Sequence, residues 1–102
     1  MKGQKEKGNV VTEKKLDTYF STTEKAILFA KKAPKEKGKQ KEAEVCIDMA
    51  ERYFSDAKHF RSKGEYVLAY GCVNYAHGWL DCAARLGLFK VKDSSLFTVD
   101  ED

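Results

Sequence analysis

The sequence predicts an all-α fold, an antiparallel three-helix bundle with a C-terminal extended segment that packs on the third helix. Three observations support this prediction. Apolar residues recur with the 3.6-residue period of a helix in three successive segments. Pro34, Gly64 and Gly87 stand where these segments end. The chain of 102 residues is long enough to bury one hydrophobic core and too short for two of ordinary size.

We expect the first helix at about residues 11–32. Ser21 to Glu24 matches a capping box, which would start a new helix at Ser21. The apolar stripe keeps its phase across Ser21, however, and this favours one continuous helix that ends before Pro34. The residues of that stripe are Leu16, Tyr19, Phe20, Thr23, Ile27 and Ala30.

The second helix is predicted at about residues 40–62. Its apolar line is formed by Ala43, Ile47, Ala50, Phe54 and Ala57. The opposite side is charged or polar, so this helix is amphipathic. Gly64 suits the left-handed residue that closes a helix.

The third helix, at about residues 65–86, is apolar around most of its circumference. Such a helix must be covered on most sides, and two neighbouring helices cover only part of it. One candidate for the missing cover is the C-terminal segment, expected to be extended and apolar at Leu88, Phe89, Val91, Leu96, Phe97 and Val99. The other is a second copy of the protein, which would form a homodimer through the third helix.

The ends of the chain and its composition limit the classes of protein to which it can belong. Residues 1–9 are rich in glycine and lysine and are expected to be disordered, residues 10–99 form one helical domain, and residues 100–102 are an acidic tail. The sequence has neither an apolar run of about 20 residues nor a signal peptide, which predicts a cytoplasmic protein without a membrane partner. Lysine and glutamate dominate the charged residues, as in many thermophile proteins.

Cys46, Cys72 and Cys82 are an odd number, and no Cys-x-x-Cys pair occurs. We therefore interpret all three as small buried apolar residues rather than as disulfide or metal sites. The two histidines, His59 and His77, are isolated from any metal-ligand spacing, so no metal and no cofactor are predicted.

A polar stripe on the third helix is the main candidate binding site. Asn74, His77, Asp81 and Arg85 follow one another at helical spacing and align on one face. An imidazole, a carboxylate and a guanidinium on one face could bind an anion or a base. The alternative is that this is the solvated face of the helix. Flanking glycines, Gly71 and Gly78, would allow a ligand or another helix to approach closely.

Two further patterns predict contact with nucleic acid. Residues 1–42 carry twelve lysines against six acids, whereas residues 43–102 carry seven basic against ten acidic groups. The lysines between the first two helices could contact phosphates, although a solvated linker is the alternative reading. They are Lys31, Lys32, Lys35, Lys37, Lys39 and Lys41. Arg52 and His59 are similar in spacing to the Arg-x6-His motif of small helical ribonucleases, in which the two side chains act on phosphate.

Residues 51–97 resemble a family of short archaeal proteins catalogued as domain of unknown function 357. The resemblance is carried by the segments 51–60, 64–70, 74–81 and 85–89, and the run Asn-Tyr-Ala-His-Gly-Trp-Leu-Asp at 74–81 is its most distinctive part. The resemblance implies an antiparallel helical bundle from an archaeal cytosol. It implies no activity and brings no catalytic residues.

The sequence as a whole favours an uncharacterised helical protein that acts by binding a protein partner or itself. A nucleic-acid-associated protein that uses the lysines of residues 31–41 is the second hypothesis. A ribonuclease-like enzyme is the third, and no catalytic residues are predicted for the chain beyond that resemblance in spacing.

Overall fold

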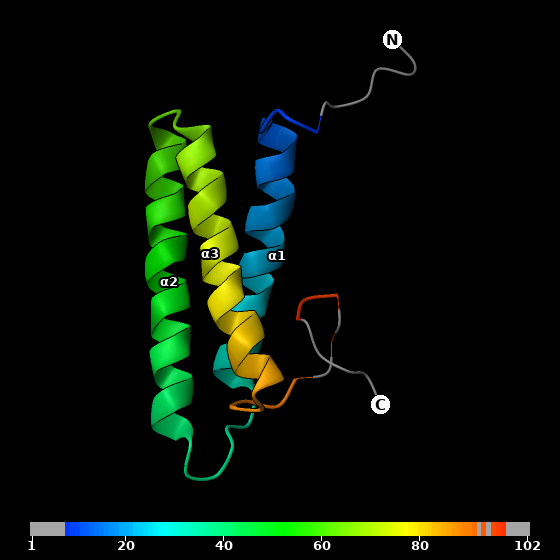
Figure 1. Ribbon diagram of the computed structural model, residues 1–102, viewed down its shortest axis with the longest axis vertical. Coiled ribbons are helices and arrows are strands. Elements are labelled where there is room, and N and C mark those ends of the chain that lie inside the picture. Colours follow the sequence, from blue (N-terminus) through cyan, green and yellow to red (C-terminus); the bar gives the residue numbers. More distant parts are fainter. Residues whose placement is uncertain (1–7, 92, 94, 98–102) are drawn as a thin grey trace.

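The computed structural model describes residues 8–91, 93 and 95–97 and confirms the all-α three-helix bundle. Helix α1 spans Glu13–Lys32, α2 spans Gln40–Ser62 and α3 spans Tyr66–Arg85. Helices α1 and α3 run in the same direction, and α2 runs antiparallel to both (Figure 1). The α2–α3 hairpin is the most closely packed pair, and α1 lies against one side of it.

Helix α1 is continuous through Ser21, as the phase of its apolar stripe predicts. It begins two residues later than expected because Thr12 is its N-cap, with the Thr12 side chain accepting a hydrogen bond from the Lys15 amide. It ends where Ala33 turns to extended geometry before Pro34.

The turns that follow α2 and α3 are closed as the sequence predicts. Gly64 and Gly87 have φ values of 76° and 75°, in the left-handed region that glycine adopts without strain. Glycine at these two positions therefore allows α2 to reverse into α3, and α3 to reverse into the C-terminal segment.

The core lies along the line where the three helices meet. It consists largely of alanine together with Leu16, Ile27, Ile47, Phe54, Val73 and Leu80. Small side chains on facing positions allow the helix axes to come close, which explains the tight α2–α3 pair.

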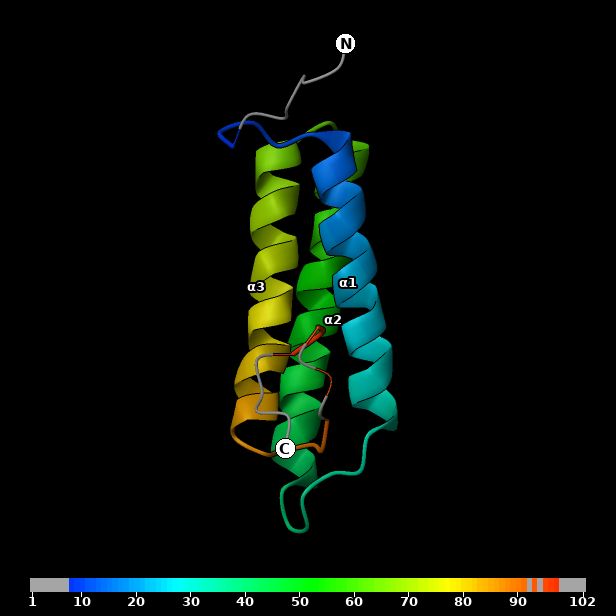
Figure 2. The ribbon, with the colours of Figure 1, turned by 90° about the vertical axis from the view of Figure 1, so that its right-hand side faces the viewer.

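The C-terminal segment folds back on the seam between α1 and α3, on the side away from α2 (Figure 2). Phe89, Leu96 and Phe97 are buried there. This confirms the predicted packing on the third helix for the described residues, while Val99 and the acidic end at 100–102 lie outside them, as do residues 1–7 of the expected disordered start.

The local geometry of this segment differs from the expectation. An extended stretch exists at Phe89, which forms an antiparallel bridge with Lys35. Asp93 and residues 95–97 instead belong to a turn, because the Asp93 carbonyl accepts hydrogen bonds from the amides of Leu96 and Phe97. The Asp93 carboxylate also accepts a bond from the Ser95 amide, which favours that turn.

Candidate functional site

His77, the centre of the predicted polar stripe, joins three parts of the chain. Its Nδ1 lies 2.9 Å from the Thr23 hydroxyl of α1, and its Nε2 lies 2.6 Å from the Leu96 carbonyl of the C-terminal segment. A carbonyl only accepts, so Nε2 must carry a hydrogen. The Thr23 hydroxyl, which is buried, can either donate to Nδ1 or accept from it. His77 therefore holds the C-terminal segment on the bundle.

The other stripe residues surround this junction at the surface. The Asp81 carboxylate lies 3.7 Å from the same His77 Nε2. Asn74 is exposed and forms a hydrogen bond with Tyr70, and the bonds from Tyr19 and then Asn74 lower the pKa of the Tyr70 hydroxyl. Arg85 is exposed at the end of α3. The structure thus brings His77 and Asp81 together. Both ring nitrogens of His77 are already engaged by contacts that hold the fold together.

The lysine-rich linker is only partly solvated, which corrects the expectation of a free loop. Backbone hydrogen bonds pair residues 34–36 with residues 88–90. Lys35 Nζ donates to the carbonyls of Ala30, Lys31 and Ala33 at 2.7–3.0 Å and so caps α1. Lys31 forms an ion pair with Glu51 at 2.7 Å.

Five of the six lysines lie exposed on the surface, and Lys31 is one of them despite its ion pair. The other four are Lys32, Lys37, Lys39 and Lys41. Lys31 is paired with Glu51 of α2, and Lys35 binds the carbonyls at the end of α1. This end of the bundle therefore presents less positive charge to a partner than the sequence alone suggests.

Arg52 and His59 are both exposed on α2, and they have different neighbours. Arg52 Nε is paired with Asp48 at 2.8 Å, one turn earlier on the same helix. The His59 ring packs against Phe60, with 5.6 Å between the ring centroids. Arg52 and His59 therefore both contact neighbours within α2.

Arg61 is a structurally important residue that sequence analysis missed. Its Nη2 lies 2.6 Å from Asp17 and 3.0 Å from Glu13, and its guanidinium stacks over the Phe20 ring. Hydrogen bonds from Arg61 and then Tyr66 lower the pKa of the Glu13 carboxyl. The signal was present: Arg61 is in phase with the apolar line of α2, four residues after Ala57, so its side chain faces α1 rather than solvent.

Two shallow hollows follow the looser seam between α1 and α2. Their volumes are about 230 and 310 Å³, and Lys31 and Glu51 line both of them. Leu28 is 53% exposed at the edge of the first. The walls mix the two signs of charge, with two lysines and two glutamates around the first hollow and two lysines and three carboxylates around the second.

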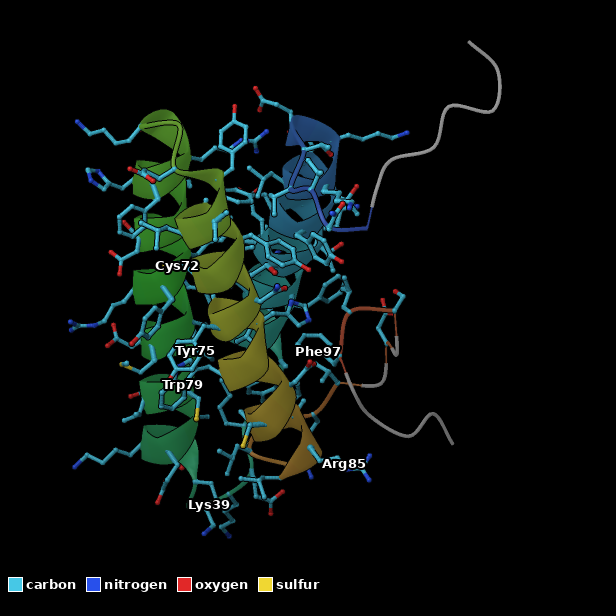
Figure 3. The ribbon with its side chains drawn as sticks, turned by 45° about the horizontal axis from the view of Figure 1, so that its top comes forward. Lys39, Cys72, Tyr75, Trp79, Arg85 and Phe97 are labelled. Carbon is cyan, nitrogen blue, oxygen red and sulfur yellow. The ribbon has the colours of Figure 1, made fainter. Side chains whose placement is uncertain are left out.

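An apolar surface lies on the other side of the bundle, where α2 and α3 meet away from α1. Tyr75 is 55% exposed at its centre and packs edge-to-face on Tyr53 and on Trp79. Figure 3 shows Cys72, Tyr75 and Trp79 along this side of α3 and Phe97 on the opposite side. We call this surface the α2–α3 face. We define it by half-buried or exposed residues of the two helices, namely Cys46, Met49 and Tyr53 of α2 and Val67, Leu68, Gly71, Cys72, Tyr75, Gly78, Trp79 and Cys82 of α3.

The cysteines differ from the prediction of three buried residues. Cys82 is exposed, and Cys46 and Cys72 are half-buried. The pKa of the Cys46 thiol is raised mainly by burial and to a smaller extent by the nearby Cys82. The prediction failed because it treated the third helix as covered on all sides, whereas the α2–α3 face has no cover within the described chain.

The glycines of α3 are open to solvent on this same face. A Cβ atom built on Gly71 or Gly78 would have no neighbour within 4 Å. Close helix–helix packing inside the bundle, one interpretation of these glycines, therefore does not explain them.

Within the described residues, no group of three or more histidine, cysteine, aspartate or glutamate side chains could hold a metal ion. In the same part of the chain, no helix combines the length and the apolar character that crossing a membrane requires.

The fold and its surfaces define a small helical bundle. Comparison with known families shows which family this bundle belongs to. Residues 18–89 match the family described as protein of unknown function, DUF357. The chain belongs to this family, and the match covers α2, α3 and α1 from Thr18 onward. No curated protein and no solved structure matches the chain.

Proposed function

We propose that this protein is an interaction module that acts by self-association, with two copies bound through the α2–α3 face. The observation that carries this proposal is the exposure of an apolar helix surface. Single exposed apolar residues are ordinary, but a continuous line of them along one helix is typical of an interface. On α3 this line includes Val67, which is 74% exposed, together with Leu68 and Tyr75.

The size of the face is sufficient for a stable pair. Helix α3 has 20 residues. At 1.5 Å per residue and about 10 Å per helix width, the two-helix face measures roughly 30 by 20 Å, or about 600 Å² per copy. Two copies would then bury about 1,200 Å², the lower end of the range for specific interfaces.

The composition of the face agrees with this use. Tyr53, Tyr75 and Trp79 form one cluster of ring contacts near its centre. Tyrosine and tryptophan dominate the energetic centres of protein interfaces, because they bury a large area and lose little conformational entropy. A charged ligand would find little on this face to pair with.

The other partners predicted from sequence have less support. The lysine linker shares its charge with Glu51 and with the end of α1, and Arg52 is paired within α2. We infer a cytoplasmic location, because Cys46, Cys72 and Cys82 are free thiols and such an unpaired set suits a reducing compartment.

Sedimentation equilibrium of the full chain tests the proposal. We expect a mass of twice 11.6 kDa at high protein concentration and dissociation on dilution. In Tyr75→Lys the mass should fall to that of one chain, since a buried lysine without a counter-charge opposes pairing. Val67→Lys should have the same effect, and its exposed position means that folding is preserved.

Leu28→Lys is the matched control. Leu28 is about as exposed as Tyr75 but lies at the α1–α2 seam, so this variant should remain paired. A wild-type mass of one chain at every concentration would refute self-association. Equal loss of pairing in the Leu28 and Tyr75 variants would refute the assignment to the α2–α3 face.

A further inference from the structure

We propose that one end of the bundle binds single-stranded nucleic acid, with basic side chains that hold phosphates and with a base stacked on Phe29. We call this surface the basic end and define it by residues 32–42 and 85–91. The proposal goes beyond self-association and does not rest on it, because Phe29 belongs to α1 and the α2–α3 face lies away from that helix.

The fold brings two segments that are distant in sequence to the basic end. The Lys90 amide donates a hydrogen bond of 2.9 Å to the Pro34 carbonyl. Figure 1 shows the α1–α2 connection and the chain after α3 at the same end of the bundle, and Figure 3 shows Lys39 and Arg85 there. Arg85 and Lys90 therefore join the lysines of the linker, which offsets the ion pairing of Lys31 within the bundle.

The basic end carries the excess positive charge of the molecule. Its two segments hold seven basic side chains against two carboxylates, a net charge of +5. The remaining described residues hold eight basic against ten acidic side chains, a net charge of −2. Such a separation of charge steers a polyanion toward one end of the protein. The seven basic residues are Lys32, Lys35, Lys37, Lys39, Lys41, Arg85 and Lys90.

The contacts within the basic end favour binding of phosphate. Lys90 forms an ion pair with Glu36 at 2.8 Å, so this lysine neutralises the carboxylate that lies among the linker lysines. Lys37 and Lys39 are exposed on either side of Gly38, whose φ of 80° allows the turn between them. Exposed lysines of this kind can replace the counterions of a phosphate backbone.

An exposed aromatic side chain lies next to these charges. Phe29 is 52% exposed and lies one turn before the end of α1. Lys25 and Lys32 are four residues before it and three residues after it, so the three side chains share one side of the helix, and both lysines are exposed. A base can stack on the phenyl ring when it is not already stacked in a duplex, while phosphates on either side reach the lysines. This arrangement favours a single strand over a duplex.

An anionic membrane surface is the other polyanion that a basic end could meet. Binding to such a surface depends on apolar side chains that enter it as well as on charge. Leu86, which is 69% exposed, is the one large apolar side chain exposed within the basic end. A single leucine supplies little of the apolar area that stable membrane binding needs, so the observations favour nucleic acid.

Fluorescence anisotropy of a labelled oligouridylate at several salt concentrations tests the role of the lysines. We expect the logarithm of the association constant to fall linearly with that of the salt concentration, by about 0.7 for each phosphate contact. The double variant Lys37→Gln/Lys39→Gln should bind more weakly, with a slope smaller by about 1.4.

The matched control is Lys14→Gln/Lys63→Gln, which removes the same charge from exposed positions at the other end of the bundle. This variant should keep the wild-type slope. The same reduction of the slope in both double variants would overturn the assignment to the basic end. Absence of any wild-type binding at low salt would overturn the proposal as a whole.

Phe29→Ala tests the stacking, and Leu28→Ala is its control, since Leu28 is 53% exposed at the neighbouring position and has no ring. Phe29→Ala should weaken binding of the oligouridylate about tenfold and leave binding of duplex RNA nearly unchanged. Leu28→Ala should bind both as the wild type does. An equal loss for strand and duplex in Phe29→Ala would overturn the stacking role. Tighter binding of the wild type to phosphatidylglycerol vesicles than to the oligouridylate would overturn nucleic acid as the partner.

Discussion

His77 connects three segments that are distant in sequence, since Thr23 and Leu96 are 54 and 19 residues away from it. The periodicity of α3 could predict that His77 shares a face with Asp81, because that relation is local. It could not predict that the imidazole would be enclosed by α1 and by the C-terminal segment. Such contacts depend on how the segments pack, and the same residue type in the same pattern on a free helix would be solvated.

We expect His77→Phe to lower the free energy of unfolding by about 1–3 kcal/mol, the cost of leaving buried polar groups unsatisfied. The groups are the Leu96 carbonyl and the Thr23 hydroxyl. Urea denaturation of this variant and of His59→Phe measures the difference, because His59 is exposed and should tolerate the change. Equal stability of the two variants would contradict the role of His77 in the fold.

Gly71→Ala should stabilise the folded chain. It should raise the stability of the single chain by up to about 1 kcal/mol, because alanine favours the helix and its Cβ meets open space. Thermal unfolding at low protein concentration measures this effect. A melting temperature at or below that of the wild type would contradict the open position of Gly71 on α3.

At the level of whole helices, local signals in the sequence were sufficient. The bounds of α2 agree with the prediction because the apolar line gives its extent and Gly64 marks its end. Helix α1 crosses Ser21 without a break. The C-terminal segment was harder. Its apolar residues predicted burial correctly at Phe89, Leu96 and Phe97. The turn there depends on hydrogen bonds to Asp93, which strand propensity does not describe.

The Arg61 cluster ties the start of α1 to the α2–α3 hairpin, and it makes stability sensitive to acid. The folded-state pKa of Glu13 is below its ordinary value of 4.5. This stabilisation is therefore complete above pH 4.5 and is lost as the pH falls through the lower folded-state value. We expect Glu13→Gln to lack that part of the acid-induced loss of stability, as measured by urea denaturation between pH 6 and pH 3.

Glu44→Gln is the control for that experiment. Glu44 is exposed near the start of α2, far along the helix from Arg61. This variant should lose stability with falling pH as the wild type does. If Glu13→Gln and Glu44→Gln had the same pH profile as the wild type, the ion pairs of Arg61 would not contribute measurably.

For the whole molecule, the composition of α3 was the most informative feature of the sequence. A helix that is apolar on nearly all sides predicted more cover than two helices supply, and the C-terminal segment provides it on the α1 side. On the other side Val67, Leu68 and Tyr75 stay exposed in a single chain. Sequence alone could not separate the two kinds of cover, because both require only that the helix be apolar.

Alkylation of Cys82 is the most direct measurement of whether a second copy covers the α2–α3 face. Cys82 is exposed in the single chain, and no substitution is needed. If two copies pair through this face, the rate of Cys82 alkylation, followed by mass spectrometry, should fall as the protein concentration rises. A rate that stays constant from dilute to concentrated protein would show that the face remains open and would contradict self-association through it.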